Sequence, residues 1–273
     1  MNPLMHVTFT LKVLEHAGIK KSQQDIVLGS VLPDISILGI IPEYDAHKKG
    51  VAFLDYLSHN EPALKPFGVG WVLHGEEPEC LDFHVHKKNG YIDKNKQEVL
   101  ELSKKHKIEF EGVHNEVLAH TLIEFACDSL AEKETTKILK KAFKQADLEK
   151  ISYHIAKFYC ADQKRVLKIL KFFKHFNFNK LRTMHGIAHT MQDFMFYIKF
   201  ADKNARRKDL TNINWLKACK YLWTRINTFK THRIISLLKE VREVVKEDCH
   251  TFLEETKIRI SAKVVKKTLG EYL

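Results

Sequence analysis

The sequence lacks the features that define several large classes of protein. No apolar run reaches the roughly 20 residues of a membrane-spanning helix, and no charged segment followed by an apolar one marks a secretory signal. The five cysteines form no CxxC pair, which argues against a disulfide framework and favours a reducing compartment. GxSxG and P-loop motifs are also absent. We therefore expect a soluble, cytoplasmic protein.

Strand-like alternation of apolar and polar residues is nearly absent too, and residues 258–264 are its one weak candidate. Apolar residues instead recur at helical spacing, as Val7, Leu11 and Leu14 do. Residues 76–107 are mainly polar, and we interpret them as a long loop with one small helix. The main helices of the second half are expected at residues 113–131, 134–146, 147–160, 162–175, 181–202, 212–227 and 231–248. The pattern predicts an all-α fold, a compact multi-helix bundle.

Charge and histidine are distributed unevenly along the chain. Residues 1–125 hold 13 Lys and Arg against 18 Asp and Glu, together with ten of the 16 histidines. The remaining residues hold 32 Lys and Arg against 16 Asp and Glu, a net charge of +16. The first half thus has the residue types of a cation site, and the second half those of an anion-binding surface. We expect a metal-binding helical region at 1–130 and a basic helical region at 131–273, within one domain.

His120 and Glu124 stand four residues apart in an apolar stretch of an expected helix. This spacing places both side chains on one helical face. A carboxylate on an apolar face is costly unless it is paired or bound to a cation. The pair is therefore either a hydrogen-bonded couple inside the core or part of a metal site.

Two other places combine metal-ligand types with apolar neighbours. Asp34 follows Pro33 just past a helix end, where it is either a turn or capping residue or a ligand. His185, His189 and Asp193 recur at every fourth position. One metal could bind two neighbours of this series but not all three, because the outer two lie too far apart along the helix. The alternative is a solvated stripe.

The order of these residues along the chain carries a resemblance. Along the chain come a histidine near the N-terminus, then Leu–Pro–Asp at 32–34, then a histidine on the next helix. Next comes Gly–Trp–Val–Leu–His at 70–74, with another histidine ten residues on, and last comes HxxxE. This order resembles the zinc-dependent phospholipase C and single-strand nuclease family over about residues 1–125. The segments around His6 and Leu28–Asp34 match best. The resemblance implies a metal cluster in the N-terminal half of a helical bundle, with two or three zinc ions; other divalent metals are alternatives.

The resemblance also implies which residues would bind each metal. A first ion would take Asp34, His47 and His74; a second, His84, His120 and Glu124; a third would be bound in part by His6.

One position departs from the family pattern. In that family, an aspartate four residues after the middle histidine bridges two metals. In this chain, Pro78 stands at that position. A neighbouring glutamate at 76, 77 or 79 could supply the missing carboxylate, and so could His189 with Asp193. Otherwise the cluster has lost one metal.

The activity that the resemblance implies is metal-dependent hydrolysis of a phosphodiester or related phosphate ester, phospholipase C-like. Asp34 is the candidate base or water-orienting residue, because it would lie beside the metal. The expected partner is a phosphate-containing small molecule, a lipid headgroup or a nucleic acid; neither substrate-binding residues nor a protein partner can be identified. Two alternatives remain: a metal-stabilised helical protein without catalysis, and a basic nucleic-acid-binding helical protein with structural histidines.

The basic half contains one helix with a clear polar face. Its cations are Lys164, Arg165, Lys168, Lys171 and Lys174, opposite Val166, Ile169, Leu170 and Phe173. The face is either an anion-binding surface or an ordinary solvated one. We expect Phe172, Phe173 and Phe176 in the core, which would leave few exposed rings for stacking on nucleic-acid bases. His154 is expected at the surface.

Overall fold

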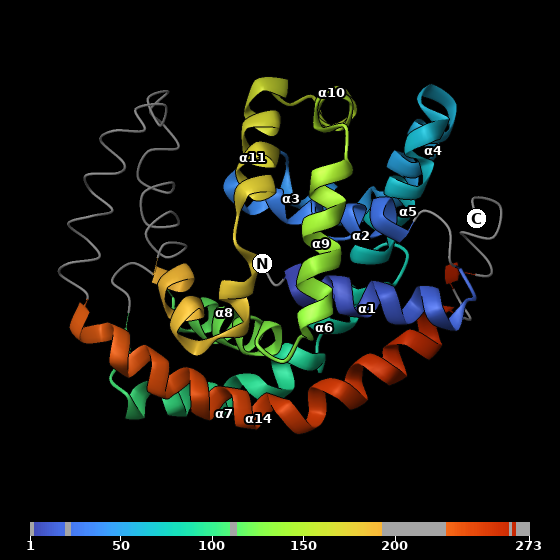
Figure 1. The fold of residues 1–273 in the computed structure, drawn as a ribbon. Coiled ribbons are helices and arrows are strands. Elements are labelled where there is room, and N and C mark those ends of the chain that lie inside the picture. Colours follow the sequence, from blue (N-terminus) through green and yellow to red (C-terminus); the bar gives the residue numbers. More distant parts are fainter. Residues whose placement is uncertain (1–2, 20–22, 110–113, 193–227, 262–263, 266–273) are drawn as a thin grey trace. The chain divides into compact units, whose positions relative to one another are not determined.

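The computed structural model describes residues 3–19, 23–109, 114–192, 228–261 and 264–265, and the elements in these ranges are helical, without a strand (Figure 1). The all-α prediction is confirmed for them. The α-helices are α1 (Pro3–His16), α2 (Gln23–Gly29), α3 (Glu43–Lys48), α4 (Gly50–Asn60), α5 (Lys65–His74), α6 (Leu81–His86), α7 (Tyr91–Lys105), α8 (Asn115–Asp128), α9 (Lys133–Gln145), α10 (Leu148–Tyr159), α11 (Gln163–His175) and α14 (Thr228–Ile260). Short 3₁₀ helices are η1 (Pro33–Leu38), η2 (Pro62–Leu64) and η3 (Phe178–Arg182), and residues 184–192 are also helical.

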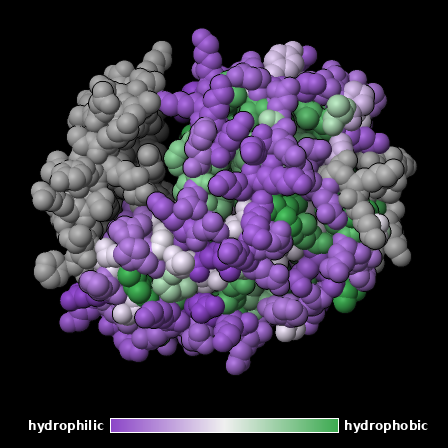
Figure 2. All heavy atoms as spheres, in the orientation of Figure 1, coloured by the Kyte–Doolittle hydropathy of each residue, from purple (hydrophilic) through white to green (hydrophobic). Residues whose placement is uncertain are grey.

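The chain divides into two compact units. The first comprises Met1–Asp93, Ala131–Phe178 and Asp248–Leu273, and the second comprises Lys94–Leu130 and Asn179–Glu247. Neither unit is continuous in sequence. In the described part of the chain, no helix is both long and apolar enough to cross a membrane. The surface visible in Figure 2 is mainly hydrophilic, with separate hydrophobic patches between the polar side chains.

One prediction about local structure was wrong, and the one weak strand candidate is helical where the structure describes it. Residues 76–107 are not mainly a loop, because α6 and α7 occupy most of them. Helix α7 is strongly polar, but Val99 on its inner face is fully buried, and this narrow apolar stripe suffices for a surface helix. Of residues 258–264, the described ones are helical: α14 continues to Ile260, so the alternation of apolar and charged residues there lies on a helix.

The helices α10 and α11 begin where the sequence places side-chain caps. The carboxylate of Asp147 accepts a hydrogen bond from the backbone N–H of Lys150 at 3.0 Å. Asp162 accepts from the N–H groups of Lys164 and Arg165, at 2.8 and 3.2 Å. These bonds satisfy donors that the first helical turn leaves without a partner. Both helices therefore start within two residues of the expected positions.

The basic helix α11 is amphipathic as expected, with two corrections in its neighbourhood. Val166 and Leu170 are buried, whereas Lys164, Lys168 and Lys171 are exposed and Lys174 is half-buried. Phe172, expected in the core, is 55% exposed, because it lies on the polar side of the helix. His154 on α10, expected at the surface, is buried because α10 packs against α4. Its Nδ1 lies 3.1 Å from the hydroxyl of Tyr56.

Helices α2 and α5 lie unusually close together in the first unit. A Cβ atom at Gly29 would lie 1.9 Å from the carbonyl oxygen of Phe67, and one at Gly70 would lie 1.9 Å from that of Ile26. Glycine is therefore required at both positions, since no side chain fits between the two backbones. The close approach brings the end of α2 to the end of α5, which positions the site described next.

Candidate metal centre

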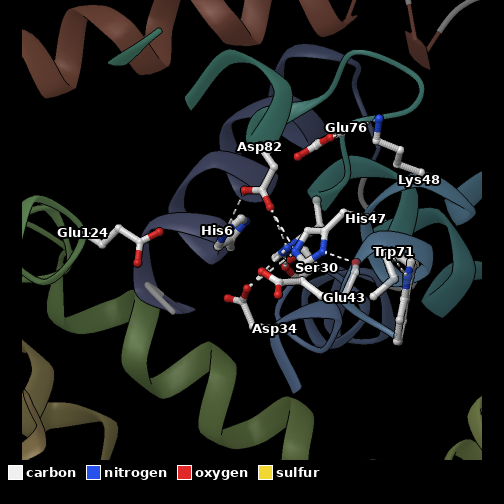
Figure 3. Close-up of polar contacts among 12 residues, drawn as sticks. His6, Ser30, Asp34, Glu43, His47, Lys48, Trp71, Glu76, Asp82 and Glu124 are labelled. Carbon is white, nitrogen blue, oxygen red and sulfur yellow. Dashed lines mark hydrogen bonds and ion pairs between the residues drawn. The ribbon is translucent and has the colours of Figure 1, made fainter. Parts of the chain in front are cut away.

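Five side chains from five elements of the first unit converge on one place (Figure 3). His6 comes from α1, Asp34 from η1, His47 from α3, His74 from the last residue of α5, and Asp82 from the first turn of α6. We call these five residues the His/Asp cluster. His6, Asp34, His74 and Asp82 are each at most 5% exposed. Ionisable groups so deeply buried need partners of opposite charge or a bound ion.

The orientation of His74 depends on the contact between α2 and α5. Its Nδ1 lies 2.8 Å from the backbone carbonyl of Ser30, the residue after α2. A carbonyl only accepts, so Nδ1 carries the proton and donates it, and the lone pair of the neutral ring is on Nε2. This hydrogen bond fixes both the tautomer and the ring plane. Hydrogen bonds of this kind orient most histidines that bind metals.

His47 is held in the same manner. Its Nδ1 donates to the backbone carbonyl of Glu43 at 2.8 Å, so the lone pair of the neutral ring is also on Nε2. Helix α3 is fixed against α5 because Trp71 Nε1 donates to the carbonyl of Ala46 at 2.8 Å. The backbone N–H of Glu76 donates to the carbonyl of His47 itself, also at 2.8 Å. The short helix α3 is therefore anchored on both sides of the histidine that it presents.

The cluster contains two groups of three ligand atoms that lie within 4.8 Å of one another: Asp34, His47 and His74, and His6, His74 and Asp82. Asp82 Oδ2 lies 3.0 Å from His74 Nε2 and 3.3 Å from His47 Nε2. Asp34 Oδ1 lies 3.6 Å from His74 Nε2 and 3.8 Å from His47 Nε2. Ligands at about 2.0–2.1 Å from a tetrahedral ion are about 3.3–3.4 Å apart. The four separations bracket that value.

His6 faces the other oxygen of Asp82. Its Nε2 lies 3.5 Å from Asp82 Oδ1, and its ring stacks on the ring of His74 with centroids 3.9 Å apart. The two oxygens of Asp82 are thus directed at different histidines. A carboxylate in this position can join two metal ions, one on each oxygen.

The charges within the cluster shift its ionisation strongly. Burial acts to raise the pKa of Asp34, but His74 and the other histidines outweigh it and lower that pKa to about 2. Burial likewise acts against ionisation of Asp82, yet His74 and His6 hold its pKa well below the usual range. Burial acts to lower the pKa of His47, but Asp34 and Asp82 raise it to about 9. Both carboxylates are therefore anionic at neutral pH, and the site attracts positive charge.

Asp34 and His74 each have a buried atom that lacks a hydrogen bond within the described structure. Asp34 Oδ2 has none, and His74 Nε2 approaches the carboxylates without the alignment of a hydrogen bond. Such atoms are costly unless something else satisfies them. Imidazole nitrogen with carboxylate oxygen is a ligand set that zinc and related divalent metals use. The cluster could therefore hold a metal ion.

The other sequence candidates lie elsewhere. His84 belongs to neither ligand group that includes His74; its Nδ1 is 3.3 Å from Lys87 Nζ, and burial with the charges of Lys87 and Arg259 lowers its pKa. These cations would repel a metal ion. In the second unit, His120 Nε2 lies 3.1 Å from Glu124 Oε1, as their spacing predicts.

His189 pairs with His185 in the second unit, whereas Asp193 lies outside the described residues. The predicted use of these two residues as a replacement HxxxD pair is therefore undecided.

Sequence reasoning missed Asp82 as a ligand candidate. Pro78 stands four residues after His74, where the resemblance calls for a carboxylate, and Asp82 stands eight residues after it. The turn at 75–80 occupies the extra residues and returns the chain to the cluster at the start of α6. Glu76, considered as a substitute, lies with its carboxylate 3.7 Å from Lys48 Nζ. An acidic residue between Leu81 and the apolar Val85 was the signal available in the sequence.

Comparison with known proteins adds no further identification. No protein-family model, curated protein or solved structure matches this chain.

Proposed function

We propose that the His/Asp cluster binds zinc and that the protein is a metal-dependent hydrolase of a phosphodiester or related phosphate ester, phospholipase C-like. The observation that supports the proposal best is the combination of tautomer and spacing. His47 and His74 both donate from Nδ1 to backbone carbonyls, and their Nε2 atoms lie 3.0–3.8 Å from Asp34 and Asp82. Asp34, His47 and His74 form one group of three ligands for an ion, and His6, His74 and Asp82 form another. Three protein ligands leave the fourth tetrahedral position to water.

Bound zinc supplies a hydroxide nucleophile near neutral pH and charge for a phosphoryl oxygen. The residues of the chain would do the rest. His47, His74 and Asp82 would hold the ion in place through hydrogen bonds and packing that already exist. Asp34 would use its second oxygen, Oδ2, to orient the attacking water and to take its proton, because this atom has no other hydrogen bond in the described structure.

The same unit offers charge for the remainder of an anionic substrate. Residues 131–178, which form α9, α10 and α11, contain 12 Lys and Arg against 5 Asp and Glu. Lys164, Lys168 and Lys171 of α11 are exposed. Attraction of this kind is long-range and weakened by salt. It would raise the local concentration of a phosphate ester without selecting a particular one.

The test begins with metal content. The full chain, purified without a histidine tag or added metal, should contain at least one zinc ion by elemental analysis. It should hydrolyse bis(p-nitrophenyl) phosphate or, among natural phosphodiesters, phosphatidylcholine vesicles or single-stranded DNA. Asp34→Asn should reduce turnover by about 100-fold or more, in the range expected for loss of a general base. His59→Gln, an exposed histidine on α4, is the matched control and should leave turnover unchanged.

A metal-stabilised protein without catalysis is the second candidate, and one observation favours it. Four of the five cluster residues are almost fully buried, whereas catalytic metal sites keep one position open to substrate. In that case the protein would contain zinc and lose stability on chelation, but it would hydrolyse none of the three substrates. A well-folded chain that neither contains nor takes up metal would overturn both proposals.

A further inference from the structure

His185 and His189 form a second grouping of metal-ligand atoms, apart from the His/Asp cluster. Both lie in the helical segment 184–192 of the second unit. Their Nε2 atoms are 3.2 Å apart, and their ring centroids are 4.5 Å apart at an interplanar angle of 74°. The rings are thus turned so that the same nitrogen of each faces the other.

The helix that presents the two histidines is firmly anchored. Ile187, Ala188 and Met191 on its opposite side are fully buried. At its start, the hydroxyl of Thr183 accepts a hydrogen bond from the N–H of Gly186 at 3.1 Å, which caps the first turn. Buried Gln192 donates to the hydroxyl of Thr231 on α14 at 3.0 Å. The helix is therefore held by buried contacts along one side and by a side-chain hydrogen bond at each end.

The separation of the two nitrogens identifies what they could bind. Nitrogen ligands at about 2.0–2.1 Å from one ion are about 3.3–3.4 Å apart in tetrahedral geometry and about 2.9 Å apart at a right angle. The observed 3.2 Å lies between these values. Without an ion, one Nε2–H donates a hydrogen bond to the other Nε2. An ion between the two nitrogens would take the place of this shared hydrogen.

We propose that His185 and His189 bind one divalent transition-metal ion, separately from the His/Asp cluster. Imidazole pairs suit zinc, copper and nickel and do not suit magnesium or calcium, which take oxygen ligands. The two histidines supply two ligands, and water can supply others. The site is therefore weaker than the cluster and exchanges its ion with solution, and it does not depend on the proposed hydrolase activity.

The test is a calorimetric titration of the full-length chain with Ni²⁺ alone, repeated on the double variant His185→Gln with His189→Gln. Wild type should bind one more ion per chain than the double variant. His232→Gln, an exposed histidine on α14 in the same unit, is the matched control and should bind as wild type does.

A second readout separates this site from the cluster. In an NMR spectrum of the histidine side chains, Ni²⁺ should broaden the signals of His185 and His189 in wild type and in an Asp82→Asn variant alike. Equal stoichiometry in wild type and the double variant, or broadening that disappears with Asp82→Asn, would overturn the proposal. Neither result would bear on the hydrolase assay, which is carried out with zinc and the cluster variants.

Discussion

The two groups of histidines in this chain are built in different ways. The His/Asp cluster takes its side chains from five elements and buries nearly all of them, whereas His185 and His189 lie one turn apart on the more accessible side of one helix. The cluster needs the tertiary structure of its unit, and the pair needs only a formed helix. An unpaired charge costs much free energy in the buried cluster and little where water solvates it. We therefore expect metal binding to be coupled to stability at the cluster and nearly uncoupled from it at the pair.

The largest effect should follow from removing His74, which belongs to both ligand groups of the cluster. His74→Ala should weaken zinc binding by at least about 100-fold, because changes to residues that merely orient a ligand already cost about 10–100-fold. Zinc at 1,000 times its Kd adds about 4 kcal/mol to the free energy of unfolding of the native chain. Denaturant unfolding with zinc and with a chelator should therefore differ strongly in wild type and little in the variant.

The contrast with the exposed pair supplies the control for this experiment. The double variant His185→Gln with His189→Gln should retain the wild-type response of stability to chelation. If chelation destabilises neither wild type nor the double variant, the cluster is a network of ion pairs and not a metal site. The unfolding curves would then be the same with and without zinc for all three proteins.

A change remote from the ligands should also break the cluster. Gly70→Ala would place a Cβ atom 1.9 Å from the carbonyl oxygen of Ile26 and force α2 away from α5. Forced repacking of this kind costs typically 1–3 kcal/mol. The shift would move Ser30 away from His74 and weaken zinc binding too. Gly18→Ala is the comparison, since a Cβ at Gly18 meets no atom within 4 Å and the cost comes only from its positive φ.

The sequence was informative wherever the structure is local. Caps at Asp147 and Asp162, the amphipathic face of α11 and the His120–Glu124 contact all depend on residues within one helical turn or two. Such relations have a fixed geometry once a helix forms. The expected helices between residues 113 and 175 therefore agree with the observed ones to within a few residues.

The sequence was less informative where elements meet. The order of His6, Asp34, His47 and His74 along the chain was apparent, but Asp82 joins them only because the turn at 75–80 reverses the chain. His84, two residues further on, follows the family spacing yet lies beside Lys87. A shift of one residue along a helix rotates the direction of the side chain by about 100°. A periodic pattern in the sequence does not fix that direction across a turn that precedes the helix.

The pH dependence of stability should change sign with metal. Without metal, the folded state holds the pKa of His47 at about 9, above the ordinary value of 6.5. The raised pKa stabilises the folded state fully below pH 6.5, and this stabilisation is lost as pH rises through 9. The free energy of unfolding then falls by at most about 1.4 kcal/mol per pH unit. Zinc must displace this proton, so zinc binding strengthens over the same range. Unfolding at pH 6.5, 7.5 and 8.5 should show opposite trends with chelator and with zinc.

His47→Gln isolates the contribution of this residue. The difference between wild type and the variant in chelator should shrink as pH rises, because only wild type loses the stabilising proton. A difference that stays constant between pH 6.5 and 8.5 would mean that His47 does not gain its proton from folding. The exposed variant His59→Gln should leave the profile of wild type unchanged.

The smallest effect should come from an ion network that joins distant elements without being buried. Glu254 on α14 contacts Lys12 of α1 at 2.6 Å and also Lys257, and these lysines lower its pKa to about 2. The stabilisation is present above the ordinary pKa of about 4.5 and is lost as pH falls through about 2. Because the side chains are a quarter to a third exposed, Glu254→Gln should cost less than about 1 kcal/mol at pH 7. Glu254→Gln could instead lower the free energy of unfolding as much as His74→Ala does. That result would mean that the His/Asp cluster stabilises the fold because it joins distant elements, and not because it is buried.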